Sequence, residues 1–169
     1  MSYSPSFSEN GSDTLAVAPD VSVIVPIYNE VESLEALVGA IAQSLQPTPY
    51  SYEIICVDDG SKDGSTALLK ELAKTRSDLC VVILRRNYGQ TPAMAAGFNQ
   101  AKGKFIVSLD ADLQNDPSDI PLLLAKLEEG YDLVSGWRIK RQDAALTRLL
   151  PSKVGNWLIG RVTNVRVHD

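Results

Sequence analysis

Short runs of β-branched and apolar residues alternate along this chain with longer segments in which apolar residues recur at helical spacing. The short runs predict buried strands at 21–27, 52–57, 79–84, 105–109 and 133–135. Strands that alternate with helices form βαβ units, which assemble into a mostly parallel sheet. The order therefore predicts an α/β fold: a single Rossmann-like domain with a mostly parallel central sheet flanked by helices.

The segments between the strands carry signals for helix ends. Asn29 is expected to cap a helix that runs to Leu45 and stops before Pro47. Asp116 is expected to cap a later helix that stops at Gly130. Other helices are expected at 65–74, 91–101 and 144–162, the last of them amphipathic, and a further strand is expected to begin at 165–167. The helix after Asp116 is expected to bury four leucines: Leu122, Leu123, Leu124 and Leu127.

Length and composition favour one globular domain. The chain has 169 residues, of which 44% are hydrophobic and 22% charged, an ordinary balance for a soluble core. Residues 1–20 are polar and aperiodic and are expected to be a flexible tail, with the domain at 21–169. No apolar run reaches the ~18 residues that a spanning helix needs, and the first residues do not have the pattern of a signal peptide.

The distribution of charge indicates the class of partner, and the cysteines indicate the cellular compartment. The net charge is −5, yet residues 138–169 hold seven of the 16 Lys and Arg residues. An acidic body argues against a nucleic-acid binder. The basic segment indicates a local anionic partner, either a phosphate or an anionic membrane surface. Cys56 and Cys80 lie in apolar runs and are expected to be buried free thiols, which suits a reducing, cytoplasmic compartment.

Acidic motifs follow the second and fourth predicted strands. Ligands of parallel sheets bind beyond the carboxyl ends of the strands. Asp110 and Asp112, two apart, can face the same side, and a hard cation such as Mg²⁺ or Mn²⁺ would relieve their repulsion. Gln114 is close enough to add a neutral oxygen. The alternative is a solvated loop whose acids cap the next helix.

Two other turns are candidate nucleotide contacts. The acids of Asp58-Asp59-Gly60 could accept hydrogen bonds from a base and from ribose hydroxyls, or could simply form a turn and a helix cap. Tyr28, after the first strand, could lie against a base or be a rim aromatic. The sequence has no Gly-x-Gly-x-x-Gly fingerprint and no P-loop. Its only histidine, His168, gives no case for a catalytic triad.

Taken together, three motifs resemble family 2 glycosyltransferases with the glycosyltransferase-A fold. They read Val-Ile-Val-Pro-Ile-Tyr-Asn-Glu at 23–30, Val-Asp-Asp-Gly-Ser-Lys-Asp-Gly-Ser at 57–65 and Ser-Leu-Asp-Ala-Asp-Leu-Gln at 108–114. The stretch Arg-Asn-Tyr-Gly-Gln at 86–90, followed by Ala-Ala-Gly-Phe at 95–98, is similar to the branch that loads sugars onto polyprenyl phosphates. That branch includes bactoprenol glucosyltransferases, the aminoarabinose transferases of lipid A modification and dolichol-phosphate mannose synthases. The resemblance covers residues 21–169.

The resemblance implies a role for each matching residue. Nucleotide contacts are implied for Pro26, Tyr28, Glu30, Asp58, Asp59, Gln90, Ala111 and Arg148, with Asp58 reading the base. Asp110 and Asp112 are implied to carry Mg²⁺ or Mn²⁺ and the diphosphate, with Gln114 joining the metal. Arg138 is implied to face the acceptor phosphate, with Arg148 at the donor phosphates. Asp169 is a candidate active-site carboxylate, and the 144–160 helix is implied to rest against the bilayer.

The function implied by the resemblance is transfer of a sugar, with inversion, from a nucleotide diphosphate sugar to a polyprenyl phosphate such as undecaprenyl or dolichyl phosphate. UDP-glucose is the favoured donor, and GDP-mannose stays open. Relatives of this branch continue past the position of Asp169, so we expect the chain to be the cytoplasmic domain of a longer membrane protein, active at the cytoplasmic face of the cell membrane. The resemblance is compatible with a homo-oligomer.

Three alternatives stay open at the level of sequence. The first is a family 2 transferase that acts on a sugar hydroxyl, with Asp169 as its base. The second is a nucleotidyltransferase, although its usual Gly-rich loop after the first strand is absent. The third is an inactive nucleotide-binding fragment.

Overall fold

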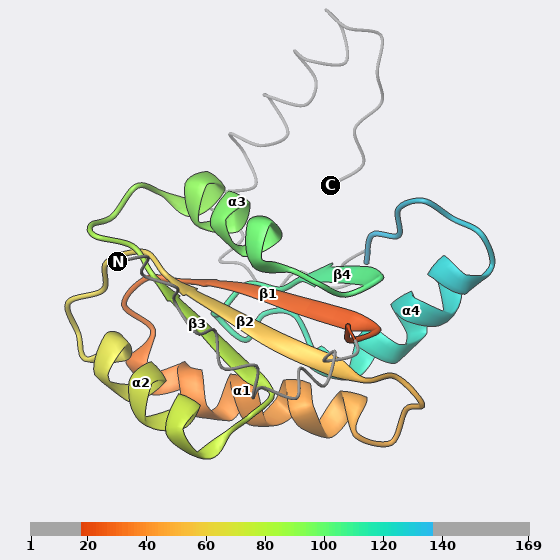
Figure 1. Cartoon of the computed structure of the whole chain (residues 1–169), viewed down its shortest axis with the longest axis horizontal. Helices are drawn as coiled ribbons and strands as arrows, with labels where there is room; N and C mark the ends of the chain where they lie inside the picture. The colour runs from red at the N-terminus through yellow and green to blue at the C-terminus, as the bar shows by residue number, and fades with distance from the viewer. Residues whose placement is uncertain (1–17, 137–169) are drawn as a thin grey trace, which may run out of the picture. The chain divides into compact units, whose positions relative to one another are not determined.

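A four-stranded parallel sheet forms the centre of the fold. The computed structural model describes residues 18–136, and the strands are β1 (Val21–Ile27), β2 (Tyr52–Asp58), β3 (Leu79–Ile83) and β4 (Phe105–Ser108). Their order is β3-β2-β1-β4, and every neighbouring pair is parallel (Figure 1). The predicted α/β class and mostly parallel sheet are therefore confirmed. The predictions for residues 1–17 and 137–169 lie outside the described residues.

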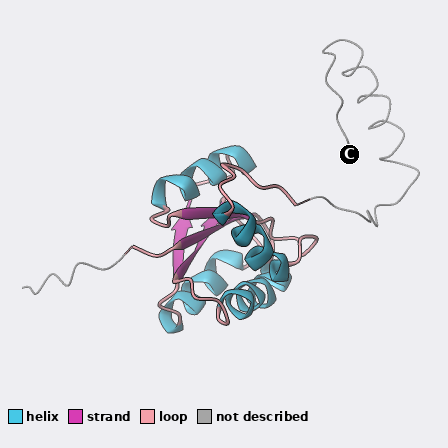
Figure 2. Ribbon diagram, turned by 90° about the vertical axis from the view of Figure 1, so that its right-hand side faces the viewer, coloured by secondary structure: helices cyan, strands magenta, loops and turns pink. Residues whose placement is uncertain are grey.

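Helices cover both faces of this sheet (Figures 1 and 2). They are α1 (Val31–Leu45), α2 (Ser65–Thr75), α3 (Gln90–Gln100) and α4 (Ile120–Glu128), with a 3-10 turn, η1 (Pro117–Asp119), before α4. In Figure 1, α3 lies on the opposite side of the sheet from α1 and α2. No helix within residues 18–136 is long and apolar enough to cross a membrane.

The side chains of β1 alternate between the two faces of the sheet, which explains why the core has two clusters. Val23 and Val25 belong to the core cluster that contains the buried residues of α1, α2 and α4. Ile24, between them, belongs to the smaller cluster under α3, because successive strand residues point to opposite faces. α3 lies close to the sheet at Gly97, where an added Cβ would collide with Cγ2 of Ile24.

Three sequence predictions about this region are wrong. Residues 133–135 form no strand, and Leu133 is 84% exposed, because these residues have no ladder partner among the described residues. Leu122 is 63% exposed rather than buried, since α4 turns Ile120 and Leu124 toward the core instead. Asn29 does not cap α1, because it has a φ of 58° and accepts a hydrogen bond from a distant loop.

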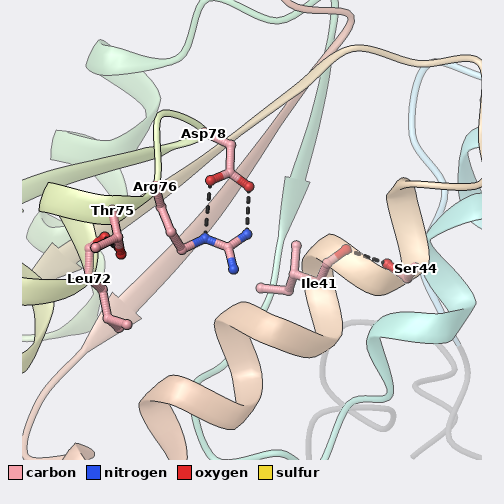
Figure 3. Close-up of polar contacts among 6 residues, drawn as sticks. All are labelled: Ile41, Ser44, Leu72, Thr75, Arg76 and Asp78. Carbon is pink, nitrogen blue, oxygen red and sulfur yellow. Dashed lines mark hydrogen bonds and ion pairs between the residues drawn. The ribbon is translucent and has the colours of Figure 1, made fainter.

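An ion pair fixes the connection between α2 and β3 (Figure 3). Nε and Nη2 of Arg76 donate to the two carboxylate oxygens of Asp78 at 3.1 and 2.6 Å. The backbone carbonyl of Asp78 accepts from the N–H of Ile54 at 2.8 Å, which joins this turn to β2. Figure 3 also draws the hydroxyl of Ser44, which donates to the carbonyl of Ile41 within α1.

Candidate functional site

The carboxyl ends of β1, β2 and β4 meet the start of α3 around one pocket. Its volume is about 380 Å³, within the range of small-molecule sites. Its position agrees with the rule that parallel sheets bind ligands beyond the carboxyl ends of their strands. The lining residues are Pro26, Ile27, Tyr28, Glu30, Asp59, Asn87, Gly89, Gln90, Ala93, Asp110, Ala111 and Asp112.

The turn from β1 into α1 forms one wall of the pocket. Tyr28, at 44% exposure, stands at its rim. Asn29 holds the turn through its Oδ1 atom, which accepts from the N–H of Lys62 at 2.8 Å. Oδ2 of Asp63 accepts from the N–H of Val31 at 3.0 Å, so a residue of a distant loop caps α1.

Glu30 brings a carboxylate to the same wall. Its backbone N–H donates to the hydroxyl of Ser65 at 3.0 Å, and its Oε2 atom accepts from the hydroxyl of Ser33 at 3.0 Å. Its Oε1 atom has no partner among the described residues. A carboxylate oxygen on the pocket wall can accept from the N–H of a base or from a ribose hydroxyl.

The two acids at the end of β2 have different surroundings. Asp58 is fully buried, with Oδ1 accepting from the N–H of Ser61 at 2.9 Å and Oδ2 accepting from the hydroxyl of Thr66. Asp58 therefore holds the following turn and does not line the pocket. Asp59, 3% exposed, lines the pocket, and its two oxygens accept from the N–H groups of Tyr88 and Gly89, each at 2.8 Å.

Gly60 allows the loop after β3 to approach the end of β2. Its φ is +74°, in the left-handed region that favours glycine. A Cβ at this position would lie 2.5 Å from the carbonyl carbon of Arg86 and 2.7 Å from the nitrogen of Asn87. The sequence therefore requires glycine here both for the turn and for the contact.

The end of β4 brings two further carboxylates to the pocket. Oδ1 of Asp110 accepts from Nε2 of Gln90 at 2.8 Å. Oδ1 of Asp112 accepts from the N–H of Gln114 at 3.0 Å, which forms a tight turn around Leu113 at a φ of 58°.

The donor chemistry at the end of β4 suits a hard divalent cation. Asp110 and Asp112 offer two carboxylates on the wall of one pocket, and Mg²⁺ and Mn²⁺ prefer such oxygen ligands. Within the described residues, no three His, Cys, Asp or Glu side chains gather as a metal cluster. The protein would thus supply few ligands, and water or a bound ligand would supply the rest, as is usual for Mg²⁺.

The structure brings most of the predicted site residues together. The pocket is lined by eight of them: Pro26, Tyr28, Glu30, Asp59, Gln90, Asp110, Ala111 and Asp112. Asp58 and Gln114 lie next to this set but do not line the pocket, and Arg138, Arg148 and Asp169 lie outside the described residues.

Sequence reasoning missed four lining residues, namely Ile27, Asn87, Gly89 and Ala93. Asn87 and Gly89 belong to the 86–90 stretch that carries the family resemblance, so a signal for them was present. Asp63, the residue that caps α1, had no comparable signal, because its partner Val31 is 32 residues away.

A parallel sheet with an acid-lined pocket at its carboxyl edge defines an α/β domain, and the family match and the solved structures given below assign it to the glycosyltransferase-A fold. The family model described as glycosyl transferase family 2 matches residues 22–167, and the chain belongs to this family. It is similar to the dodecaprenyl-phosphate galacturonate synthase of Rhizobium johnstonii, with 43% identity over 152 residues, 89% of this chain and 45% of the relative. It is also similar to the undecaprenyl-phosphate 4-deoxy-4-formamido-L-arabinose transferase of Pseudomonas fluorescens, with 47% identity over 150 residues, 88% of this chain and 44% of the relative.

Solved structures share the same fold. The mannosyltransferase PcManGT from Pyrobaculum calidifontis, in complex with GDP-Man and Mn²⁺, matches with a TM-score of 0.51 and 29% identity over 62% of this chain and 30% of its own. S. aureus TarS 1–349 in complex with UDP-GlcNAc matches with a TM-score of 0.54 and 23% identity over 72% of this chain and 37% of its own. The chain spans less than half the length of each of these relatives.

Proposed function

We propose that this chain carries the donor site of a glycosyltransferase that moves a sugar from a nucleotide diphosphate sugar to a polyprenyl phosphate. The observation that carries the proposal is the pocket itself, which has carboxylates from β4 on one wall and the Tyr28 turn on another. A nucleotide sugar needs both a place for its base and ribose and a cation-binding place for its diphosphate. The names of the two curated relatives, which specify polyprenyl phosphates, support the acceptor class.

The proposal also specifies the sugar and the nucleotide base of the donor. We favour a UDP-sugar, and the sequence alone favours UDP-glucose. The names of the relatives, a galacturonate synthase and a formamido-arabinose transferase, instead favour a uronic acid or an aminopentose derivative. The GDP-Man complex of the Pyrobaculum mannosyltransferase keeps GDP-mannose open.

In the proposed donor complex, Tyr28 and Glu30 bind the nucleoside, and Asp110 and Asp112 hold Mg²⁺ or Mn²⁺ beside the diphosphate. When bound, the cation neutralises the negative charge that develops on the leaving nucleoside diphosphate. The bond between the anomeric carbon and the diphosphate oxygen breaks, with its electron pair leaving on the diphosphate. A bond from an oxygen of the acceptor phosphate to the same carbon forms, with inversion in a single displacement.

The acceptor phosphate needs little help from a general base. A phosphomonoester has a second pKa near ~6, so it is mostly dianionic at neutral pH. The chemistry requires instead that cationic side chains guide this dianion against repulsion from the donor. We propose Arg138 for the acceptor phosphate and Arg148 for the donor phosphates, Asp169 as a further active-site carboxylate, and a reaction at the membrane surface, where a polyprenyl phosphate resides.

The test is the variant Asp112→Asn. It keeps the size of the side chain and an oxygen for the turn at Gln114, but it removes the charge that would bind the cation. We expect transfer to polyprenyl phosphate to fall by about 100-fold or more, because this electrostatic contribution amounts to several kcal/mol. The assay follows transfer of labelled sugar into the lipid fraction at several Mg²⁺ and Mn²⁺ concentrations.

Asp116→Asn is the matched control. Asp116 lies four residues further on, caps η1 through the N–H of Ser118 at 2.9 Å and does not line the pocket. Because asparagine is an equally good cap, this variant should keep its activity. Near-normal transfer by Asp112→Asn, or transfer by the wild-type chain to a sugar hydroxyl and not to the lipid phosphate, would contradict the proposal.

A further inference from the structure

The side chains of two residues that line the pocket make hydrogen bonds to protein groups, which points to a role in positioning their neighbours. We propose that Asp59 and Gln90 are positioning residues: Asp59 holds the start of α3, and Gln90, at that start, orients the carboxylate of Asp110. The inference rests on the proposed function only for what Asp110 does. It reassigns Asp59 and Gln90, for which the resemblance implies direct nucleotide contacts.

Both carboxylate oxygens of Asp59 bind the protein backbone. Its two oxygens each accept one backbone N–H, from Tyr88 and from Gly89, at 2.8 Å. Its own N–H donates to the carbonyl of Ile27 at 2.8 Å, so its backbone is tied to the end of β1. At 3% exposure, the charged group is nearly removed from water, and such a group is stable only with strong hydrogen bonds such as these.

These hydrogen bonds fix the place where α3 begins. Gly89 precedes the helix with a φ of 97°, and Gln90 is the first helical residue. The backbone at 86–87 is held at the same time by its close contact with Gly60. The backbone at Gln90 is therefore located by two independent contacts from the end of β2.

Gln90 carries this constraint to the end of β4. Its Nε2 atom donates to Oδ1 of Asp110 at 2.8 Å. β2 and β4 are not neighbours, because β1 lies between them in the sheet. The series from Asp59 through the start of α3 to Gln90 and Asp110 thus connects the acidic ends of two separate strands across the pocket.

The chemistry of glutamine suits this task. Its carboxamide donates a hydrogen bond but carries no charge, so it orients Asp110 without neutralising the carboxylate. Groups that orient a metal-binding carboxylate typically change metal affinity by about 10- to 100-fold when they are mutated. In Asp59→Asn, the amide oxygen replaces one carboxylate oxygen, but the NH₂ group that replaces the other cannot accept a hydrogen bond from a backbone N–H. The variant should therefore loosen the start of α3 and so affect Asp110 indirectly.

The first measurement needs no ligand. In the ¹H–¹⁵N spectrum of the full chain, the side-chain amide signals of Gln90 are identified by their loss in Gln90→Ala. In Asp59→Asn we expect these signals to move toward the positions of a solvent-exposed carboxamide. Asp20→Asn is the matched control, since Asp20 also accepts a backbone N–H, from Ser51 at 2.8 Å, but at the opposite end of the sheet. Unmoved Gln90 signals in Asp59→Asn would overturn the inference.

The second measurement is the Kd of UDP with Mn²⁺, by calorimetry, for the wild type, both single variants and the double variant. We expect each single variant to weaken binding by about tenfold, and the double variant to be no weaker than the weaker single, because residues that act in series are not additive. Additive losses would overturn the inference. If the wild type binds no nucleotide, the proposed function fails, while the signals of Gln90 still decide the positioning role.

Discussion

Gly60 is the position at which a single methyl group should disturb both the fold and the pocket. Its left-handed φ of +74° costs alanine about 1–2 kcal/mol. The added Cβ would meet backbone atoms of Arg86 and Asn87 at 2.5 and 2.7 Å, and overpacking of this kind costs about 1–3 kcal/mol. Alanine also restricts the unfolded chain, which offsets ~0.4–1 kcal/mol. We therefore expect Gly60→Ala to lower the free energy of unfolding by about 1–5 kcal/mol.

Two other glycines separate the causes of this loss. Gly130 has a φ of +102° but no atom within 4 Å of an added Cβ, so Gly130→Ala measures the conformational cost alone. Gly39 lies inside α1 with no positive φ and no such neighbour, so Gly39→Ala should stabilise the fold by ~0.5–1 kcal/mol. Urea unfolding, followed by circular dichroism, gives the free energy of unfolding of each variant.

The order of stability of the three glycine variants and the wild type tests the close contact at Gly60. It should run Gly39→Ala, wild type, Gly130→Ala and Gly60→Ala, from most to least stable. The loop that Gly60 contacts carries Asn87 of the pocket wall, so Gly60→Ala should also weaken nucleotide binding, whereas Gly130→Ala should leave it intact. If Gly60→Ala were as stable as Gly130→Ala, the close contact between the two loops would be refuted.

Two further predictions concern the rest of the fold. Burial alone would raise the pKa of Asp78, but the hydrogen bonds and the positive charge of Arg76 lower it below the ordinary value of 3.8. The lowered pKa stabilises the fold at pH values above 3.8. This stabilisation is lost as the pH falls through the pKa of Asp78 in the folded state. Arg76→Met should therefore lower the free energy of unfolding by about 1 kcal/mol at pH 7. Measured by urea unfolding, this difference from the wild type should shrink as the pH falls below 3.8. A difference that does not change with pH would contradict the ion pair. Burial, followed by the influence of Cys80, raises the pKa of the Cys56 thiol to about 12, so at pH 8 a disulfide reagent should modify the partly exposed Cys80 first. Rapid modification of Cys56 in the folded chain would show that its strand is not buried.

The strands and most of the helices could be predicted because their signals are local. β1, β2, β3 and β4 each coincide with an apolar run to within a residue at either end. The stop at Gly130 is confirmed, whereas Asp116 caps the 3-10 turn η1 that leads directly into α4. The error at 133–135 has a physical cause. An apolar run becomes a strand only when a neighbour supplies the ladder, and a sequence pattern does not reveal that neighbour.

The site was predictable to the extent that topology brings its parts together. Parallel strands place their carboxyl ends at one edge, which is why Tyr28, Asp59 and Asp110 all line one pocket. Hydrogen bonds between segments far apart in the sequence were not predictable. The bond from Asp63 to Val31 and the pair from Asp59 to the start of α3 depend on how loops pack, and only the structure gives them.

We propose that a nucleotide and a cation bind between the carboxylates of Asp110 and Asp112 and the turn from β1 into α1. The most direct measurement is a crystal structure of the full chain with UDP and Mn²⁺, in which the anomalous signal of manganese locates the metal. We predict manganese in contact with Asp110 or Asp112 and with the diphosphate, and the uracil near Tyr28. Manganese bound away from both aspartates, or UDP bound outside this pocket, would contradict the account.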